Sequence, residues 1–294
     1  MQNLELVSVI ITTYLRPQNL LRAIDSVINQ TYKNIEIIIV DDNGLGTDSQ
    51  LETYSLLQEY ISRGMIKYYP HEKNKNGSAA RNTGYRMSKG VYINFFDDDD
   101  EMLPDKIQKQ VSSLQAKNKD FGACTCNMKI KNPHRTFLTN NKKEGNVLVE
   151  LLTGKYNFNT STILFRRSTL DILNGWDESF LRHQDFEICV RFFRQFKMAL
   201  VQDALVVKYS TPNIITRNPL KAIEYREFFI SSFLFDFKTT GKSNAILCFL
   251  YSELSLILLK SNYKKEGWFY VKKSFKYGLP SFYDLLKMLM YLLL

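Results

Sequence analysis

An acidic run, Asp97 to Glu101, places five consecutive carboxylate side chains after Phe95 and Phe96, which follow a strand-like stretch at residues 90–94. Such a cluster repels itself unless a cation sits in it. Residues two apart on an extended segment point to the same face, so Asp97 and Asp99 can share one hard divalent ion, which could carry a diphosphate. A solvated acidic loop is the alternative interpretation of a charge run. The run alone leaves both interpretations open.

Other ways of holding phosphates or metals find little support in the sequence. There is no GxGxxG between the first strand and helix and no GxxxxGK[ST] in the chain, so a glycine cradle for phosphates is not indicated. The four cysteines show neither a CxxC pair nor a zinc spacing, and the three histidines are scattered, which favours structural or surface roles. With no signal-peptide pattern at the N-terminus, we expect a reduced, cytoplasmic protein.

The elements that must position the acidic run alternate between strands and helices. Continuous β-branched runs at residues 6–12 and 35–40 are typical of strands buried on both faces, and shorter strand patterns occur at residues 65–69 and 90–94. Helical spacing begins at Pro17 and recurs at residues 51–61 and 78–88. This alternation predicts an α/β fold with a mainly parallel central sheet flanked by helices.

Polar side chains follow three of these predicted strands. Thr12, Thr13 and Tyr14 come after the first, Asp41 and Asp42 after the second, and the acidic run after the fourth. Parallel sheets bind ligands beyond the carboxyl ends of their strands. We therefore expect the three loops to converge on one ligand site.

The last part of the chain differs from the rest in charge. Residues 216–294 hold 12 Lys or Arg against 6 Asp or Glu, so most of the net charge of +9 lies there, among many apolar and aromatic residues. Neither of the stretches at 227–235 and 245–251 reaches the roughly 18–20 apolar residues that span a bilayer. Basic amphipathic helices of this kind lie on anionic membrane surfaces or pack on their own domain. Both alternatives stay open.

Several motifs, in a fixed order, resemble the inverting glycosyltransferases of family 2, which have the nucleotide-sugar-binding fold called GT-A. Residues 7–14 resemble the opening strand of that family, 39–42 its second motif, 80–84 its ARNxG segment, and 96–106 its metal-binding DxD region. Later, residues 174–178 and 184–187 are similar to its acceptor-side motif and catalytic carboxylate. The resemblance covers about residues 5–210. It implies a GT-A domain at residues 1–215. Residues 216–294 are not covered by the resemblance, and from their composition we expect a basic, aromatic-rich helical extension there.

The resemblance also assigns roles to residues. It implies that Asp99 is the direct ligand of Mn²⁺ or Mg²⁺. It further implies a nucleotide-sugar pocket lined by Thr13, Tyr14, Arg16, Asp41, Arg81, Asp97 and Asp98. In such a pocket Asp41 could accept a hydrogen bond from a uracil ring. Four consecutive aspartates leave the register open, and one of Asp98 and Asp100 could instead cap the helix that follows.

Asp185 is the candidate general base, because an inverting transfer needs a carboxylate across the pocket from the metal to deprotonate the acceptor hydroxyl. Helix capping is the structural alternative for Asp185. The acidic neighbour usual in the family is replaced by Gln184, and a histidine often found in the family is absent from residues 206–211. Arg191 and Lys208 are candidates for the missing charge neutralisation.

The function implied is transfer of a sugar from a nucleoside diphosphate sugar, with UDP as the expected nucleotide. The expected acceptor is a hydroxyl of a saccharide or lipid-linked saccharide, as in bacterial surface polysaccharide synthesis. We expect a cytoplasmic protein, with peripheral attachment to the inner face of the membrane as a further expectation. The alternatives are a metal-dependent sugar nucleotidyltransferase and a non-enzymatic, basic membrane-surface binding protein. Nucleic-acid binding is disfavoured by the acidic run.

Overall fold

The computed structural model describes residues 4–209 and 218–293. The chain divides into two compact units, one formed by Met1–Asn146 and Asn157–Thr211, the other by Val147–Tyr156 and Pro212–Leu294. The short segment Val147–Tyr156, which the sequence assigns to the first domain, therefore belongs to the second unit. The predicted boundary at residues 215 and 216 lies outside the described residues.

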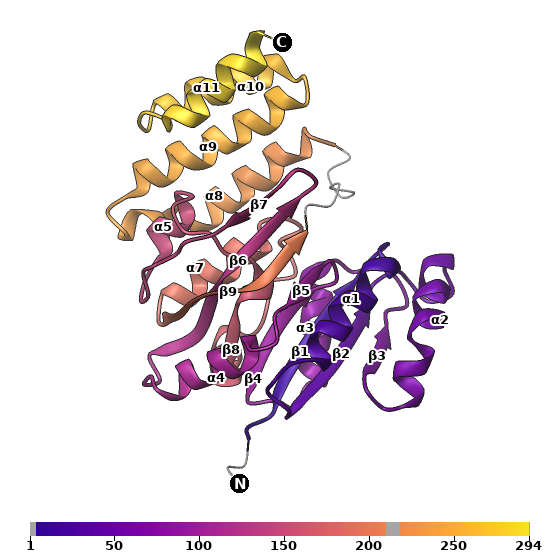
Figure 1. The fold of residues 1–294 in the computed structure, drawn as a ribbon. Coiled ribbons are helices and arrows are strands. Elements are labelled where there is room, and N and C mark those ends of the chain that lie inside the picture. Colours follow the sequence, from indigo (N-terminus) through magenta and orange to yellow (C-terminus); the bar gives the residue numbers. More distant parts are fainter. Residues whose placement is uncertain (1–3, 210–217, 294) are drawn as a thin grey trace. The chain divides into compact units, whose positions relative to one another are not determined.

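The first half of the large sheet is parallel, as predicted. Its strands run in the order β3 (Lys67–Pro70), β2 (Ile35–Asp41), β1 (Val7–Thr13) and β4 (Tyr92–Asp97). All three strand pairs are parallel, and Thr13 lies level with Asp41 while Thr12 lies level with Asp97. This register brings the polar ends of β1, β2 and β4 to one edge of the sheet (Figure 1).

The second half of the sheet is mixed. From β4 the order continues through β8 (Leu164–Arg166), β6 (Phe121–Asn132) and β9 (Lys197–Tyr209) to β5 (Asp100–Met102), and β7 (Arg135–Leu138) pairs with β6. The β6–β9 pair is parallel, whereas β8, β5 and β7 are antiparallel to their neighbours. Within the β5–β9 pair, Asp100 lies opposite Lys208. The sheet as a whole is mostly parallel, which confirms the predicted fold class.

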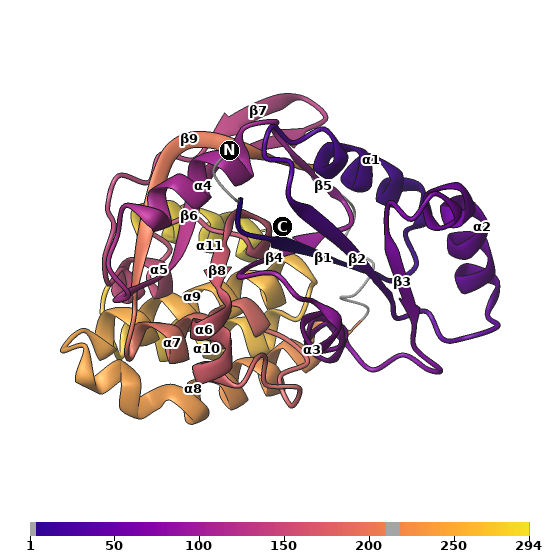
Figure 2. The same cartoon turned by 90° about the horizontal axis from the view of Figure 1, so that it is seen from below.

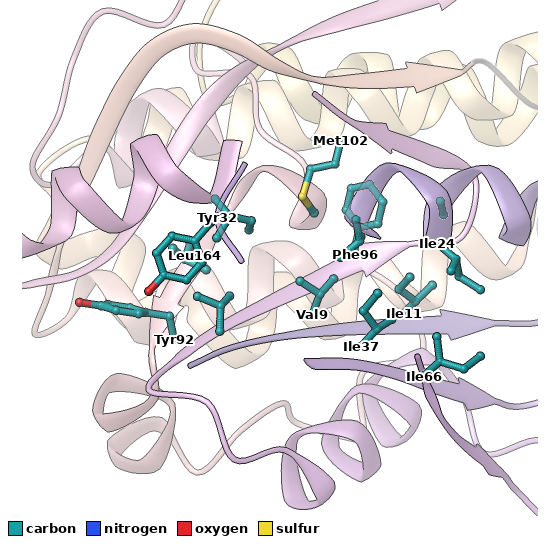
Figure 3. Close-up of a cluster of buried hydrophobic side chains, with 14 of the residues drawn as sticks. Val9, Ile11, Ile24, Tyr32, Ile37, Ile66, Tyr92, Phe96, Met102 and Leu164 are labelled. Atoms are coloured by element: carbon teal, nitrogen blue, oxygen red, sulfur yellow. The ribbon is translucent and has the colours of Figure 1, made fainter. Parts of the chain in front are cut away.

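Helices cover both faces of the parallel strands. The helices and the 3-10 turn of this unit are α1 (Pro17–Ile28), α2 (Asp48–Ser62), α3 (Gly77–Met87), α4 (Lys106–Gln115), η1 (Thr160–Thr162), α6 (Arg167–Leu173) and α7 (Gln184–Phe193). Figure 2 shows α1 and α3 on opposite sides of β1 and β2. Because strand side chains alternate, Val9 and Ile11 meet Ile24 of α1 in the core cluster of Figure 3, while Ile10 faces α3.

The second unit is helical, as predicted for the C-terminal extension. Its helices are α5 (Leu148–Leu152), α8 (Lys221–Thr239), α9 (Ser243–Lys260), α10 (Lys264–Phe275) and α11 (Phe282–Leu293). Each of the other four helices contacts α9. Figure 1 shows α8, α9, α10 and α11 as successive helices in orange to yellow.

Helix α9 continues beyond the apolar stretch at residues 245–251. Among the described residues it is the one helix that is long and apolar enough to cross a membrane by length and composition, with 18 residues and a mean hydropathy of 1.3. Ser252, Glu253 and Ser255 interrupt its apolar residues, so the stretch at 245–251 itself stays short of the roughly 18–20 apolar residues that span a bilayer. However, 56% of this segment is buried inside the structure. That burial is typical of the core helix of a helical unit.

Candidate active site

The acidic run divides between two strands. Asp97 ends β4, Asp98 and Asp99 form the turn, and Asp100 begins β5. One carboxylate oxygen from each of Asp97, Asp99 and Asp100 lies within 4.8 Å of the others. The suggestion that Asp98 or Asp100 caps the next helix is wrong, because Asp105 precedes α4 and no side chain caps it. Asp98 instead accepts a 2.8 Å hydrogen bond from the Thr13 hydroxyl.

The three clustered carboxylates fit a divalent cation. Hard ions such as Mn²⁺ and Mg²⁺ take carboxylate oxygens as ligands, and three oxygens at this spacing can converge on one ion. The Oδ1 atom of Asp100 is buried and accepts no hydrogen bond from the described residues, so it is available as a ligand. Such an ion would also offset the cost of burying several like charges together.

Burial and mutual repulsion shift the acidity of the run. Burial raises the pKa of Asp98 to about 7, and the charges of Asp99 and Asp97 add to this effect. Burial also raises the pKa of Asp100 to about 7, with Asp97 and Asp99 contributing. Burial opposes ionisation of Asp97 too, but the nearby charges of Arg81 and Lys208 outweigh it and hold the pKa of this carboxyl below its usual value.

Besides Arg81, which pairs with Asp97, three further cations lie against the acidic cluster. Arg16 pairs with Asp99 and lies 3.8 Å from Asp98, and Arg22 donates a 2.8 Å hydrogen bond to the carbonyl of Asp99. The Nζ atom of Lys208 lies 4.0 Å from Asp100. Burial alone would lower the pKa of Lys208, but Asp100, Asp97, Asp99 and Asp185 together raise it, so the side chain stays charged.

The loops after β1 and β2 form the side of the site assigned to the nucleoside. Tyr14 is 40% exposed and could offer its ring to a base. Asp41 is fully buried; its carboxylate accepts hydrogen bonds from the Tyr68 hydroxyl at 2.7 Å and from the backbone and side chain of Asn43. Asp41 thus already accepts three hydrogen bonds from neighbouring protein groups.

Asp42 and His71 organise the neighbouring loop. Asp42 accepts hydrogen bonds from the backbone of Lys75 and Asn76, and His71 bridges Asp42 to the Thr83 hydroxyl of α3. These contacts fix the start of α3 relative to β2. His71 therefore has the structural role expected from the sequence.

Arg81 connects two motifs that lie far apart in the sequence. Its guanidinium donates to Gln184 at 2.9 Å and to Asp97 at 3.2 Å, and it lies over the Trp176 ring at 4.7 Å from the centroid. Gln184 thus accepts a hydrogen bond where an acidic residue would have formed an ion pair. Arg191 does not reach the acidic cluster, because it is held by Glu187 and by the carbonyls of Leu173 and Gly175.

Asp185 lies inside the first turn of α7 and does not cap it. The residue preceding the helix is His183, which makes no capping hydrogen bond, so the capping alternative for Asp185 is wrong. Instead, Asp185 Oδ1 accepts a 2.5 Å hydrogen bond from the Thr160 hydroxyl. The other carboxylate oxygen, Oδ2, takes no part in this contact.

A short polar turn, which was not among the residues predicted for the site, joins Asp185 to the acidic cluster. Three consecutive side chains each donate to a different acid: Asn159 to Asp97 at 3.3 Å, Thr160 to Asp185 at 2.5 Å, and Ser161 to Asp100 at 2.6 Å. The sequence signal was an uninterrupted polar run, residues 159–162, just before an apolar strand. Such runs also occur in ordinary loops.

The arrangement of strands and helices in the first unit is that of the GT-A fold of glycosyltransferases. The sequence model for "Glycosyl transferase family 2" matches residues 8–173, more than half of the chain. The protein therefore belongs to glycosyl transferase family 2.

Individual relatives agree with this class. The chain is 28% identical over 234 residues to the amylovoran biosynthesis glycosyltransferase AmsB of Erwinia amylovora, covering 76% of each chain. It superimposes on S. aureus TarS 1-349 in complex with UDP-GlcNAc with a TM-score of 0.61 at 13% identity, covering 97% of this chain and 79% of that one. The mannosyltransferase PcManGT of Pyrobaculum calidifontis, in complex with GDP-Man and Mn²⁺, gives a TM-score of 0.62 at 17% identity, covering 99% and 86%. These likenesses confirm the GT-A fold.

Proposed function

We propose that this protein transfers a sugar from a UDP-sugar to a hydroxyl of a saccharide or lipid-linked saccharide, with inversion at the anomeric carbon. The observation that carries the proposal is the polar turn at residues 159–161, which holds Asp185 and the acidic cluster in one site. An inverting transfer needs these two functions together: a group that holds the departing diphosphate and a base for the incoming hydroxyl.

The acidic cluster is proposed to hold Mn²⁺ or Mg²⁺ through Asp99, with Asp97 and Asp100 as further ligands. When bound, such an ion would stabilise the negative charge that develops on the leaving diphosphate. Arg16 and Lys208 lie against the same carboxylates and would balance their charge or bind phosphate oxygens. Asp98 accepts a hydrogen bond from Thr13 and would position the loop after β1.

Asp185 is proposed to accept the proton of the acceptor hydroxyl. The Thr160 hydroxyl donates to one carboxylate oxygen and so fixes the plane of the carboxylate, which leaves the other oxygen for the acceptor. Arg81, held by Gln184 and stacked on Trp176, would lie between the acceptor side and the donor side of the site.

The donor and acceptor are proposed from likeness and from sequence. TarS was solved with UDP-GlcNAc and PcManGT with GDP-Man, so the two neighbours hold different nucleotides. We propose a UDP-sugar because Thr13, Tyr14 and Asp41 stand at the positions where the family resemblance implies a pocket for a uracil nucleoside. AmsB, named for amylovoran biosynthesis, supports a polysaccharide product. We further propose a cytoplasmic enzyme that works at the inner face of the membrane.

The test is a panel of UDP- and GDP-sugars incubated with the protein, with and without Mn²⁺ or Mg²⁺. We expect metal-dependent release of UDP from one donor. Asp99→Asn should abolish the release, and Asp185→Asn should retain donor binding while losing transfer. Release of UDP without any divalent ion, or a preference for GDP-sugars, would overturn the metal or the nucleotide assignment respectively. Formation of a nucleotide sugar from a sugar phosphate would instead indicate a nucleotidyltransferase.

A further inference from the structure

Helix α11 has apolar side chains on two sides. One side packs into its own unit: Met288, with Leu285 and Tyr291, joins a cluster with Leu259 of α9 and Val271 of α10. The other side is exposed, with Phe282 at 76%, and also carries Tyr283, Leu286, Leu289 and Met290. A helix that is apolar all round normally has a partner on every side. The exposed side of α11 has no cover among the described residues.

Helix α10 presents a second exposed stripe in which basic and aromatic residues alternate. Lys265, Trp268, Lys272 and Phe275 follow one another at spacings of three and four residues, so they lie along one side of the helix, and all four are exposed. The Nζ atom of Lys272 lies 5.6 Å from the centre of the Trp268 ring. Beyond the helix, Lys276 is exposed and Leu279 is 83% exposed.

The charge of this region is one-sided. Residues 264–293 contain six lysines and two acids, Glu266 and Asp284. One lysine, Lys273, is used internally in an ion pair with Glu227 of α8. Lys287 lies over the Tyr283 ring at 4.1 Å, which keeps this cation beside the apolar side of α11. The exposed sides of these two helices therefore carry large apolar side chains together with positive charge.

We propose that the exposed sides of α10 and α11 form a docking surface for an anionic lipid bilayer. Lysines interleaved with Trp, Phe and Leu are the combination that lies at a lipid interface, with the apolar groups among the acyl chains and the ammonium groups at the phosphates. Indole rings are enriched at that depth. The charge is complementary to anionic headgroups.

Other occupants fit this surface less well. A second copy of the chain, docked through the same surface, would bring its lysines against those of the first copy, which is unfavourable. Nucleic acid would match the charge but leave Phe282, Leu286 and Leu289 in water. The central helix α9 is already covered by its neighbours, so the proposed contact lies on the surface of the bilayer and does not cross it. This inference rests on the proposed location at the inner face of the membrane and names the surface that would make the contact, and it involves no step of the chemistry.

The test is co-sedimentation of the full chain with vesicles of phosphatidylglycerol and phosphatidylcholine, and with vesicles of phosphatidylcholine alone. We expect binding to the anionic vesicles that weakens as salt is added. Because each lysine near an anionic surface contributes to binding, Lys265→Glu, Lys272→Glu and Lys276→Glu combined should weaken it at least about tenfold. Phe282→Ser, Leu286→Ser and Leu289→Ser combined should weaken it to a similar degree, and salt should then matter less.

Matched controls separate this surface from general charge and apolarity. The charge control changes the net charge by the same amount at exposed positions outside α10 and α11, with Lys119→Glu, Lys238→Glu and Lys242→Glu combined. The apolar control is Phe235→Ser, which removes a 77% exposed aromatic side chain from α8. These controls should bind vesicles as the parent protein does. Equal loss in the charge control and the α10 variant would overturn the proposal, as would no binding to anionic vesicles. If the parent protein instead formed dimers at high concentration and bound no vesicles, and the α11 variant stayed monomeric, the surface would be assigned to a second copy of the chain.

A measurement of donor turnover distinguishes the membrane-docking proposal from the proposed sugar transfer. The α10 and α11 variants should release nucleotide from a water-soluble donor as fast as the parent protein, because none of the changed residues belongs to the proposed active site. Loss of vesicle binding with intact donor turnover is the expected pair of results. A failure of the proposed chemistry would leave the vesicle result unchanged.

Discussion

At the scale of single residues, hydroxyl donors orient three of the carboxylates in the site. Asp98 and Asp100 are neighbours of the same type as Asp97 and Asp99, yet Asp98 meets Thr13 and Asp100 meets Ser161. Asp185, far away in the sequence, meets Thr160. A carboxylate held by a hydroxyl donor keeps a fixed orientation, and catalysis depends on orientation. The hydroxyl donors Thr13, Thr160 and Ser161 are therefore as important for the geometry of the site as the acids that they contact.

Thr160→Val removes the hydroxyl donor to Asp185 while keeping the volume of the side chain. If Asp185 is the base, a misplaced carboxylate should lower kcat by about ten- to a hundredfold, with the donor KM unchanged. Thr160→Ser, which restores a hydroxyl, should recover most of the rate. Steady-state kinetics of both variants, with the nucleotide sugar that the parent protein uses as donor, measure these changes in kcat and KM. A valine variant with normal kcat, or a serine variant no better than valine, would contradict the positioning role.

Lys106 provides a prediction about pH. It is fully buried, its Nζ has no hydrogen-bond partner among the described residues, and burial lowers its pKa from 10.5 to about 8. Below its folded pKa the buried ammonium destabilises the fold. Between the folded and unfolded pKa values the unfolded chain binds more protons, so the free energy of unfolding rises with pH.

Lys106→Met should therefore raise the free energy of unfolding at neutral pH, by up to about 3 kcal/mol for a shift of this size. The gain over the parent protein should shrink as the pH rises from about 8 towards about 10.5. Urea unfolding of both proteins at a series of pH values measures the difference. A gain that is the same at neutral and alkaline pH would mean that the charge of Lys106 is not its cause.

At the scale of elements, the site depends on how closely α3 approaches the sheet. Arg81 and Asn82 reach their partners because the helix packs directly on β1 and β2 at Gly84. A Cβ atom at Gly84 would lie 2.3 Å from a methyl carbon of Ile10 and 3.2 Å from one of Val40. Two strands and one helix therefore leave no room for a side chain there.

Gly84→Ala should lower the free energy of unfolding by about 1–3 kcal/mol, the usual cost of overpacking a core. The variant should also weaken donor binding, since displacement of α3 moves Arg81 away from Asp97. Arg86→Ala, on the exposed side of the same helix, should change stability by less than about 0.5 kcal/mol. Denaturant unfolding compares the two variants. If both variants were equally stable, the helix could shift without cost and the close packing would not be essential.

The elements of the first unit could be predicted in part from sequence. The parallel strands were predictable because their β-branched runs have no other stable place than a sheet covered on both sides. The pairing of β5 with β9, which sets Lys208 beside Asp100, was not predicted, because antiparallel pairing of distant segments depends on contacts that no local pattern encodes. For the same reason the polar turn at residues 159–161 could not be assigned to the site.

At the scale of the whole molecule, charge and chemistry are separated along the chain. The described acids that could hold a metal lie in the first unit, whereas most of the excess positive charge lies in residues 216–294. The sequence predicted that division of charge and the helical nature of the extension. It could not predict that α9 would be covered by its neighbours while one side of α11 stays exposed, because burial is decided by tertiary packing.

In the proposed enzyme the acidic cluster holds the nucleoside diphosphate through a divalent ion, while Asp185 acts on the acceptor. Calorimetric titration with UDP separates these two functions when it is done in the presence and absence of Mn²⁺ on the parent protein, Asp99→Asn and Asp185→Asn. We predict that UDP binds the parent protein only with the ion, that Asp99→Asn weakens binding by at least about tenfold, and that Asp185→Asn binds nearly as the parent does. UDP binding that needs no divalent ion, or that is lost in Asp185→Asn but kept in Asp99→Asn, would contradict this assignment of roles.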